Sequence, residues 1–438
     1  MTRSISTDDA ISLAKSGDAD AQYALSSVLH ERGQYDESLR WLRLAAAQSL
    51  IPARTTLATL LMDGLHCPRD LRRAVELLEP LAATQGQANL LLAEVFGFAA
   101  FGISDRATAL RYLLSAARAG EPAALRQLAL LSVCHRSWGP VRPLLDAAAR
   151  RGDAFAAYAL ACCYAEGIGG AENAALAATL CRTEAAGSQH LNQRLIHSLG
   201  ASGASPGAGP PVLSVDWRAL EETLPQLGSD VALPDAETLH VAPLIRRLPR
   251  VFHHLVLDAV IHLAAPLVRR SQIVDARTGE ARADPMRTSS HVTLSPPQHD
   301  HVLESLERCI SRVSGLPQLN SEFLQILRYR PGEQFRPHVD YFNEGGAGTY
   351  RSLADGGQRA QTALLWLSDD YSGGSTSFPK LQLEIKGARG DMLHFHNLAP
   401  DGLGHRDSLH AGLPVMAGEK WLLSQWIRAE SYPSRLKW

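Results

Sequence analysis

The stretch FLQILRYRPGEQFRPHVDYF, residues 323–342, decides the fold of the second half of the chain. It holds two short runs rich in β-branched and aromatic residues, 323–330 and 335–342, separated by Pro331 and Gly332. Further runs of this kind are QTALLWLS (361–368), STSFP (375–379), LQLEIK (381–386), DMLHFHN (391–397) and EKWLLSQWIR (419–428). Such runs between Gly and Pro predict strands. Seven of them predict an antiparallel sandwich or barrel, with helices expected upstream around 236–270 and 298–314.

The same stretch contains His338-Val339-Asp340. In a strand, residues i and i+2 point to the same face, so His338 and Asp340 can hold one metal ion together. Two histidines and one carboxylate on one face of an octahedron leave three positions open, as in non-haem Fe(II) oxygenases. The H-x-D pattern alone is weak, because it is common by chance. The third ligand must come from further along the chain, and the candidates are His394, His396, His405 and His410.

A series of spaced motifs runs through this half of the chain. Its members are, in order, Tyr329, Gly332, Phe335, His338, Asp340, Arg359, Thr362, Leu364, Trp366, Leu367, Gly373, Gly374, Thr376, Phe378, Pro379, Gly390, Asp391, Phe395, His410, Pro414, Val415, Gly418, Lys420, Trp421 and Trp426. They resemble the prolyl 4-hydroxylase group of 2-oxoglutarate dioxygenases. A fragment ending in Arg287-Thr288-Ser289 resembles that family's mobile segment. The resemblance covers roughly residues 245–430 and implies a double-stranded β-helix, or jelly roll, with flanking helices.

The resemblance also selects a ligand set and cofactors. It implies Fe(II) held by His338, Asp340 and His410, together with 2-oxoglutarate, dioxygen and ascorbate as the reductant. Lys420 would hold the second carboxylate of 2-oxoglutarate, a role that suits a compact point charge on a flexible stem. A carboxylate at Asp340 argues for hydroxylation, because related halogenases have a small residue there. His394 and His396 are expected to be wall or core residues.

Other site residues follow from the resemblance alone. Tyr329 and Thr376 would hydrogen-bond the same carboxylate of 2-oxoglutarate, although a buried tyrosine satisfied by backbone is an alternative. Trp426 would line the cofactor pocket, with aromatic core filling as its alternative. Arg287 and Arg359 are candidate residues on the substrate side of the site.

The first half of the chain, residues 1 to about 190, is rich in Ala and Leu and contains an internal repeat. The pattern G-x-x-x-A-x-x-x-L begins at Gly17, Gly120 and Gly152, Ser49 replaces Gly in another copy, and a compressed version follows Gly86. The starts are 32 to 37 residues apart. Small residues let two helices approach closely, Leu fills the seam, and Gly ends a helix in a left-handed conformation. The pattern therefore predicts stacked helical hairpins.

The unit AKSGDADAQYALSSVLHERGQYDESLRWLRLAAA, residues 14–47, resembles the Sel-like branch of the tetratricopeptide repeats. That resemblance covers roughly residues 8–187 and implies a helical solenoid. The segment GASGASPGAGPP, residues 200–211, has the composition of an interdomain linker. The sequence thus predicts a multidomain protein: an all-α repeat domain at 1–190, a linker at 191–215 and a dioxygenase domain at 216–438.

Composition limits the partners and the compartment. The formal net charge is −2, so no overall basic field attracts nucleic acid or an anionic membrane. The N-terminus MTRSISTDDAISLAKSGD has no apolar secretory segment, and no run of about 18 apolar residues predicts a membrane span. Six cysteines without a C-x-x-C pair argue against a structural zinc site or a disulfide framework. We expect a cytoplasmic enzyme with no nucleic-acid or membrane partner.

Three functions are open at this point. The first is hydroxylation of a proline in a peptide or protein, with the repeats as a possible recruiting surface for the protein substrate. The second is hydroxylation of a free amino acid or of a peptide natural product, with the repeats serving oligomerisation or docking to a partner enzyme. The third is an interaction scaffold whose oxygenase half is inactive, which the complete ligand set and Lys420 argue against.

Overall fold

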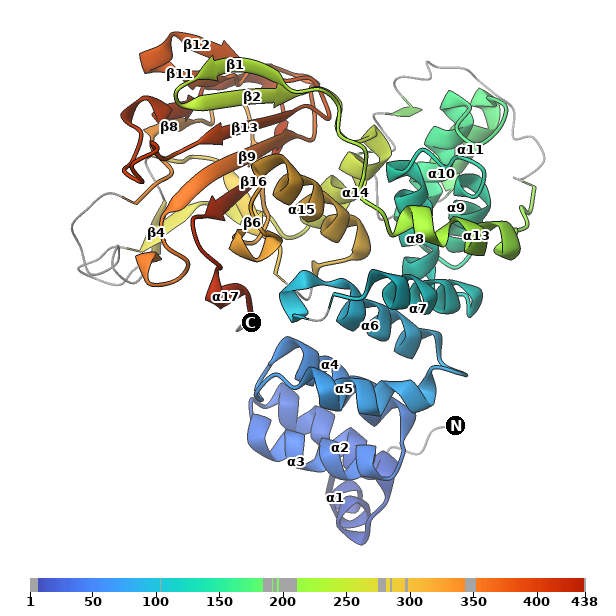
Figure 1. Cartoon of the computed structure of the whole chain (residues 1–438). Helices are drawn as coiled ribbons and strands as arrows, with labels where there is room; N and C mark the ends of the chain where they lie inside the picture. Colours follow the sequence, from blue (N-terminus) through green and yellow to red (C-terminus); the bar gives the residue numbers. More distant parts are fainter. Residues whose placement is uncertain are drawn as a thin grey trace. The chain divides into compact units, whose positions relative to one another are not determined.

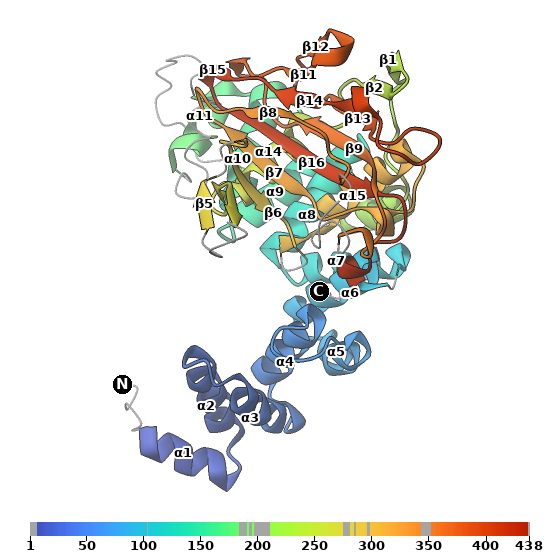
Figure 2. The same ribbon diagram turned by 90° about the vertical axis from the view of Figure 1, so that its left-hand side faces the viewer.

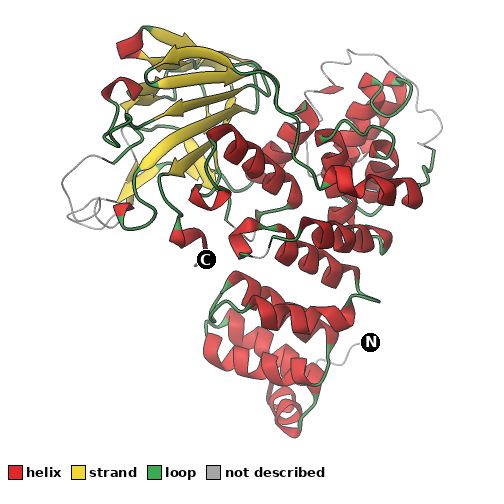
Figure 3. Cartoon of the chain, viewed as in Figure 1, coloured by secondary structure: helices red, strands yellow, loops and turns green. Residues whose placement is uncertain are grey.

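The computed structural model describes residues 7–102, 104–183, 191, 195–196, 211–274, 281–283, 286–295, 298–342 and 352–436. Its packing divides the chain between Ala124 and Leu125, inside α8 (Pro122–Cys134). The first unit is helical, whereas the second contains further helices and all the described strands (Figures 1 and 3). Apart from Pro211, the linker composition found at 200–211 lies outside the described residues.

The first unit is a run of helices in which sequence neighbours pack against each other (Figure 1). Its helices are α1 (Thr7–Ser16), α2 (Ala19–Glu31), α3 (Tyr35–Ala47), α4 (Ile51–Asp63), α5 (Leu71–Leu78), η1 (Glu79–Leu81), α6 (Gly86–Gly97), η2 (Ala99–Phe101) and α7 (Arg106–Arg118). No helix of the described chain is both long and apolar enough to cross a membrane.

The repeat pattern of the sequence has a local structural cause. Gly17 separates α1 from α2 with φ of 100°, and the neighbouring Asp18 caps α2 by accepting a hydrogen bond from Ala21 N at 2.7 Å. Ser49 takes the same left-handed conformation, with φ of 66°, where the pattern puts Ser in place of Gly. Ala53 and Leu57 of that copy are buried in the helical core. The predicted helical-repeat fold is therefore confirmed.

The second unit begins with the remaining helices of the repeat region. They are the rest of α8, α9 (Val141–Ala149), α10 (Ala154–Glu166) and α11 (Ala174–Thr183), followed in the chain by α13 (Trp217–Leu227). Asp153 caps α10 through Ala156 N at 2.8 Å, directly after Gly152 with φ of 89°. The last repeats thus pack in the same unit as the sheets that follow.

Two antiparallel sheets dominate the rest of the second unit. In the described chain, the larger has the order β1-β2-β13-β9-β16-β7-β6-β3 and the smaller β12-β11-β14-β8, and the short pairs β10-β15 and β4-β5 complete the strands (Figure 2). The bounds are β1 (Glu237–Val241), β2 (Leu244–Leu248), β3 (Arg269–Arg270), β4 (Gln272–Val274), β5 (Ala281–Ala283), β6 (Ser290–Thr293), β7 (Gln325–Tyr329), β8 (Phe335–His338), β9 (Arg359–Trp366), β10 (Tyr371–Gly373), β11 (Thr376–Phe378), β12 (Leu383–Ile385), β13 (Met392–His396), β14 (His410–Gly412), β15 (Val415–Gly418) and β16 (Lys420–Arg428).

The core lies between these sheets and is built from alternating strand residues. Leu327, Trp366 and Leu422 of the larger sheet belong to the same buried cluster as Phe378 and Ile385 of the smaller sheet. A double sheet with this core is the jelly-roll architecture expected from the sequence.

The larger sheet is flanked by the helices α14 (His254–Ala264), α15 (His301–Ser314) and the C-terminal α17 (Pro433–Leu436). The same unit also contains the short turns η4 (Gln318–Asn320), η5 (Pro379–Leu381) and η6 (Arg406–Ser408). Glu307 of α15 accepts a hydrogen bond from Gln425 of β16 at 3.2 Å. Successive side chains of a strand face opposite sides. Ser424 and Trp426, on either side of Gln425 in β16, therefore point away from α15 and into the sandwich.

The prediction of a helix around 236–270 is wrong for the first part of that range. Residues 237–248 form the β1-β2 hairpin, and the helix begins only at His254. Pro243 has no backbone N–H and interrupts a helical ladder. Ile245 and Leu248 are buried on β2, which pairs with β13 through Met392↔Leu248 and Phe395↔Ile245. Pairing with the edge of the large sheet outweighs local helical preference here. The helix expected at 298–314 is present as α15.

Candidate functional site: a two-histidine, one-carboxylate centre

A cavity of about 450 Å³ opens into the space between the two sheets. It is lined by Arg287, Gln325, Leu327, Tyr329, Phe335, His338, Asp340, Leu364, Thr376, His410, Gly412, Lys420, Leu422, Ser424 and Trp426. About half of these residues are charged or polar and the rest are apolar or aromatic, so polar groups are held at fixed points in an apolar wall, as is usual for small-molecule sites.

Two histidines lie side by side on paired strands of the smaller sheet. His338 of β8 is paired in register with His410 of β14, and their ring centroids are 4.3 Å apart. Each Nδ1 lies close to the backbone carbonyl two residues earlier: 2.8 Å from Arg336 O for His338, and 2.9 Å from Ser408 O for His410. A carbonyl can only accept, so Nδ1 carries the proton and donates it. Both Nε2 atoms therefore keep a free lone pair.

Asp340 supplies the carboxylate just beyond the end of β8. Its Oδ1 lies 3.6 Å from His338 Nε2, and its Oδ2 lies 3.6 Å from His410 Nε2. One ligand atom from each of the three residues lies within 4.8 Å of the others. Neighbouring ligands of an ion at about 2.1 Å are about 3 Å apart, so small side-chain rotations close this set around one ion. The donor set of two imidazoles and a carboxylate fits Fe(II) and leaves three positions open.

A buried hydrogen-bond chain fixes the Asp340 carboxylate. Thr362 Oγ1 donates to Asp340 Oδ2 at 2.7 Å, and Asn397 Nδ2 donates to Thr362 Oγ1 at 2.9 Å. Burial alone would raise the pKa of Asp340, but the His410 and His338 imidazoles and the Thr362 hydroxyl hold that pKa well below its ordinary value. Burial also lowers the pKa of His410 to about 4. The site thus holds an ionised carboxylate beside a neutral imidazole, which are the states that bind a metal ion.

Lys420 places a single cation in the same cavity. It begins β16, pairs in register with Tyr329 of β7, and is 2% exposed. Its Nζ donates to the Gly374 carbonyl at 2.6 Å, and no ion pair with an acidic side chain is found for it among the described residues. Burial lowers the pKa of Lys420 to about 7. Burying an ammonium group without an acidic partner costs free energy, and the carboxylate of a bound ligand would offset that cost.

The residues expected around the cofactor line this cavity too. Tyr329 is buried beside Lys420, whose Nζ lies 5.5 Å from its ring centroid, and burial raises the pKa of the Tyr329 hydroxyl. Thr376 begins β11 and pairs with Gly412 of β14. The buried indole Nε1 of Trp426 has no hydrogen-bond partner in the described structure.

The two arginines expected on the substrate side have different surroundings. Arg287 lines the cavity, its Nε donates to Ser289 Oγ at 3.4 Å, and its guanidinium lies 5.4 Å from the ring centroid of Phe335. Arg359 is absent from the lining. It makes a two-point ion pair with Glu322, at 2.7 and 2.8 Å, and lies 3.6 Å from the Trp426 ring centroid, so it braces that indole.

The other histidines weighed as ligands are engaged elsewhere. His394 is fully buried, with Nε2 at 2.6 Å from Gln361 Oε1, and His396 packs edge-on against it. His405 Nδ1 accepts from Asp407 N at 3.3 Å and caps η6.

Sequence reasoning assigned no role to several residues that the fold brings to this site. Phe335 stacks on His338 with centroids 3.5 Å apart, and Asn397 reaches Asp340 through Thr362. Gln325 and Ser424 line the cavity. Strand alternation was the available signal for Ser424, because it lies two residues from Trp426 on β16.

Comparison with known proteins agrees with this geometry. Residues 324–428 match the 2OG-Fe(II) oxygenase superfamily, and residues 19–50, 53–85, 86–121 and 154–182 match the Sel1 repeat. The chain is 31% identical over 238 residues to the probable prolyl 4-hydroxylase 10 of Arabidopsis thaliana, across 49% of this chain and 79% of that protein. The chain belongs to the prolyl 4-hydroxylase family.

Other members of the prolyl 4-hydroxylase family match a smaller share of their length. Prolyl 4-hydroxylase 1 of Arabidopsis thaliana is 34% identical over 183 residues, which cover 39% of this chain and 63% of that protein. The chain therefore spans just under two thirds of that relative.

Among solved structures, the viral collagen prolyl hydroxylase of Paramecium Bursaria Chlorella virus-1 is 24% identical, with a TM-score of 0.33 over 42% of this chain and 96% of that chain. The Sel1 repeat protein of Oxalobacter formigenes is 16% identical, with a TM-score of 0.37 over 52% of this chain and 88% of that chain.

Proposed function

We propose that the chain is an Fe(II)- and 2-oxoglutarate-dependent hydroxylase that acts on proline in a peptide or protein. One observation carries this proposal: His338, Asp340 and His410 converge in the same cavity as the ammonium of Lys420, for which no acidic partner is found among the described residues. Three ligands with open positions suit iron, and a cation deeper in the cavity suits a diacid. Membership of the prolyl 4-hydroxylase family supports both assignments.

Each side chain has a defined task in this proposal. His338, Asp340 and His410 would hold the iron, and their hydrogen bonds to backbone carbonyls and to Thr362 keep the donor atoms aimed at it. Lys420, with Tyr329 and Thr376, would hold the distal carboxylate of 2-oxoglutarate. Bound iron and 2-oxoglutarate supply the oxidising chemistry, in which 2-oxoglutarate and dioxygen give succinate and carbon dioxide while one oxygen atom enters a C–H bond of the substrate.

The protein also has to bind substrate and keep water out of the reaction space. Leu327, Leu364 and Leu422 form the apolar wall of the cavity, and Trp426 lines it with Arg359 behind its ring. Water exclusion of this kind protects reactive states from side reactions. Arg287 and Phe335 lie where the cavity admits a substrate residue, and we propose that they contact it.

The assignment to proline rests on the relatives, which are named prolyl 4-hydroxylases. We further propose a cytoplasmic enzyme that uses ascorbate as reductant, with the Sel1-type repeats presenting a protein substrate to the oxygenase domain. In that organisation the repeats extend to about residue 190, a linker covers 191–215, and the oxygenase covers 216–438. A free amino acid or a peptide natural product is the alternative substrate.

The test is an assay of substrate-stimulated succinate formation. Proline-rich peptides, free proline and other free amino acids are each incubated with the full chain, iron, ascorbate and 2-oxoglutarate. The expected result is peptide-dependent succinate formation together with the gain of one oxygen atom by a proline of that peptide, by mass spectrometry. Stimulation by a free amino acid alone would overturn the peptide assignment. A His338→Ala chain serves as the control for metal-independent background.

A further inference from the structure

Three groups of histidine and acidic side chains in the described structure are spaced closely enough to hold a metal ion. One is the site described above. In the second, His299 with Glu304 and Glu307, the space is already filled by protein donors, because Arg435 pairs with Glu307, and Gln318 donates to both carboxylates at 2.9 and 3.0 Å. The third consists of Glu166, His253 and His254, and its carboxylate is paired at 2.7 Å with His254 of the same group.

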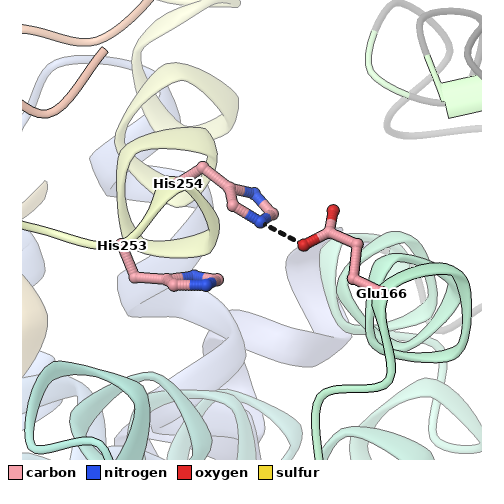
Figure 4. Close-up of side chains that lie close together, drawn as sticks. All are labelled: Glu166, His253 and His254. Atoms are coloured by element: carbon pink, nitrogen blue, oxygen red, sulfur yellow. Dashed lines mark hydrogen bonds and ion pairs between the residues drawn. The ribbon is translucent and has the colours of Figure 1, made fainter. Parts of the chain in front are cut away.

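This third group forms where two helix ends meet inside the second unit (Figure 4). Glu166 is the last residue of α10, from the final repeat. His254 is the first residue of α14 in the oxygenase part, and His253 caps that helix by accepting a hydrogen bond from Leu255 N at 3.4 Å through Nδ1. His254 Nε2 lies 2.7 Å from Glu166 Oε2, and the ring centroids of the two histidines are 4.3 Å apart. One ligand atom from each residue lies within 4.8 Å of the others.

A buried carboxylate behind His254 orients its ring. Asp258, one helical turn further along α14, is fully buried, and its Oδ2 lies 3.8 Å from His254 Nδ1. Asp258 also accepts a hydrogen bond from Tyr158 of α10 at 2.8 Å and pairs with Arg389. Nδ1 of His254 therefore faces a carboxylate while Nε2 faces Glu166. Carboxylate, histidine and metal in this order are the usual arrangement of protein metal sites.

The group is also open to solvent on one side. His253 and His254 line a cavity of about 1010 Å³ together with Cys134, Trp138 and Arg250. The Glu166 side chain is 43% exposed and that of His254 is 24% exposed. An ion can thus enter, and a water molecule from the cavity can complete a four-ligand shell. Three protein ligands with one open position are common for zinc.

We propose that Glu166, His253 and His254 form a second site for a divalent transition metal such as zinc, separate from the iron site. The ion would connect the end of α10, the first helix of the final repeat, to the start of α14 and so fasten α10 to the oxygenase part. The proposal is independent of the function proposed above, because it assigns no role in 2-oxoglutarate turnover to this second ion.

The test uses the full chain with the iron site removed by combining His338→Ala with His410→Ala, and the protein is stripped of metal with a chelator. Zinc is then added, and its binding is measured by equilibrium dialysis and by the metal-dependent rise in Tm. We expect one zinc ion per chain. Adding Glu166→Gln should weaken zinc binding by on the order of 100-fold or more, since even loss of an outer-shell partner costs about 10- to 100-fold. Gln still offers an oxygen to His254, so the Tm of the metal-free protein should stay unchanged.

Two further variants make the result decisive. Glu172→Gln changes an exposed glutamate shortly after α10 and should leave zinc binding intact. His253→Ala should abolish binding, because the proposal needs a third ligand beyond the Glu166–His254 pair. Absence of zinc binding in the chain that carries His338→Ala and His410→Ala would overturn the proposal. Unchanged zinc affinity in either Glu166→Gln or His253→Ala would overturn it as well.

Discussion

The two open clusters of histidine and carboxylate differ in how the chain builds them. His338 and His410 lie on paired strands of one sheet, and backbone carbonyls fix both rings. Glu166 and His254 lie on the ends of two helices, and a side-chain carboxylate orients the histidine. A sheet register is repeated along many backbone hydrogen bonds, whereas the two helices meet through packing and a few side-chain hydrogen bonds, such as that from Tyr158 to Asp258. Two sites with the same types of ligand residue can therefore be held in place by different structural elements.

Their surroundings differ as well. The strand cluster shares its cavity with a buried ammonium, Lys420, whereas the helix cluster borders a different cavity and has the buried Asp258 behind it. A cation in the same cavity suits an anionic ligand next to a metal. A metal ion bound between the ends of α10 and α14 would join the two helices, and metal binding of this kind is coupled to folding. The first cluster is therefore expected to control turnover, and the second to control stability.

The largest effect is expected at the strand cluster. His338→Ala removes an iron ligand and should lower succinate production by on the order of 100-fold or more, because loss even of outer-shell partners costs about 10- to 100-fold. Succinate is measured with iron and a stimulating substrate at saturation. Glu166→Gln, which alters the helix cluster, should leave turnover near that of the parent chain. Equal losses in the two variants would remove the functional distinction between the clusters.

The next largest effect concerns the ammonium. Lys420→Ala should raise the Kd for 2-oxoglutarate by about 10- to 100-fold, since hydrogen bonds to charged groups contribute about 1.5–3 kcal/mol. Calorimetry on the iron-loaded chain measures this Kd. Iron affinity should change little, because Lys420 is not a ligand. An unaltered Kd for 2-oxoglutarate would show that the diacid binds elsewhere.

The pH dependence of 2-oxoglutarate binding gives a third measurement. In the empty site the pKa of Lys420 is lowered from 10.5 to about 7, so the side chain is charged below about pH 7 and neutral above it. The diacid favours the charged form, and binding above pH 7 must therefore take up a proton. Affinity should fall about tenfold per pH unit above about 7. Lys420→Arg keeps its charge over this range and should give a flat profile. A flat profile in the parent chain would contradict the assignment.

The smallest effect is expected behind the helix cluster. Tyr158→Phe removes one of the hydrogen bonds to the buried Asp258 and should lower the free energy of unfolding by about 1–3 kcal/mol, which is a few degrees in Tm. Tyr164→Phe on the same helix is the matched control, since no hydrogen bond is found for that hydroxyl in the described structure. Differential scanning calorimetry compares the two. Turnover of 2-oxoglutarate should be unchanged in both, and a loss of turnover in Tyr158→Phe alone would connect the junction to the active site.

Much of the fold could be predicted because local patterns specify it. The small residues and left-handed positions at Gly17 and Ser49 define the repeats without any distant contact. The residues 237–248 were wrongly expected to be helical, because their strand state comes from pairing with β13 and not from local preference. Arg359 could not be placed from sequence either, since its ion pair with Glu322 joins parts of the chain 37 positions apart.

The sequence by itself determined the repeats and the strand-rich half and placed His338 and Asp340 on one face, because residue spacing within one element is a local property. His410 lies on a different strand, and its choice as a ligand followed only from the family resemblance. Only the tertiary structure decided that Lys420 is buried beside a backbone carbonyl and no acidic side chain of the described residues. It also decided that Glu166 contacts His254, which lies 88 positions further along the chain. Such contacts depend on how separate elements pack, and no periodicity along the chain encodes that packing.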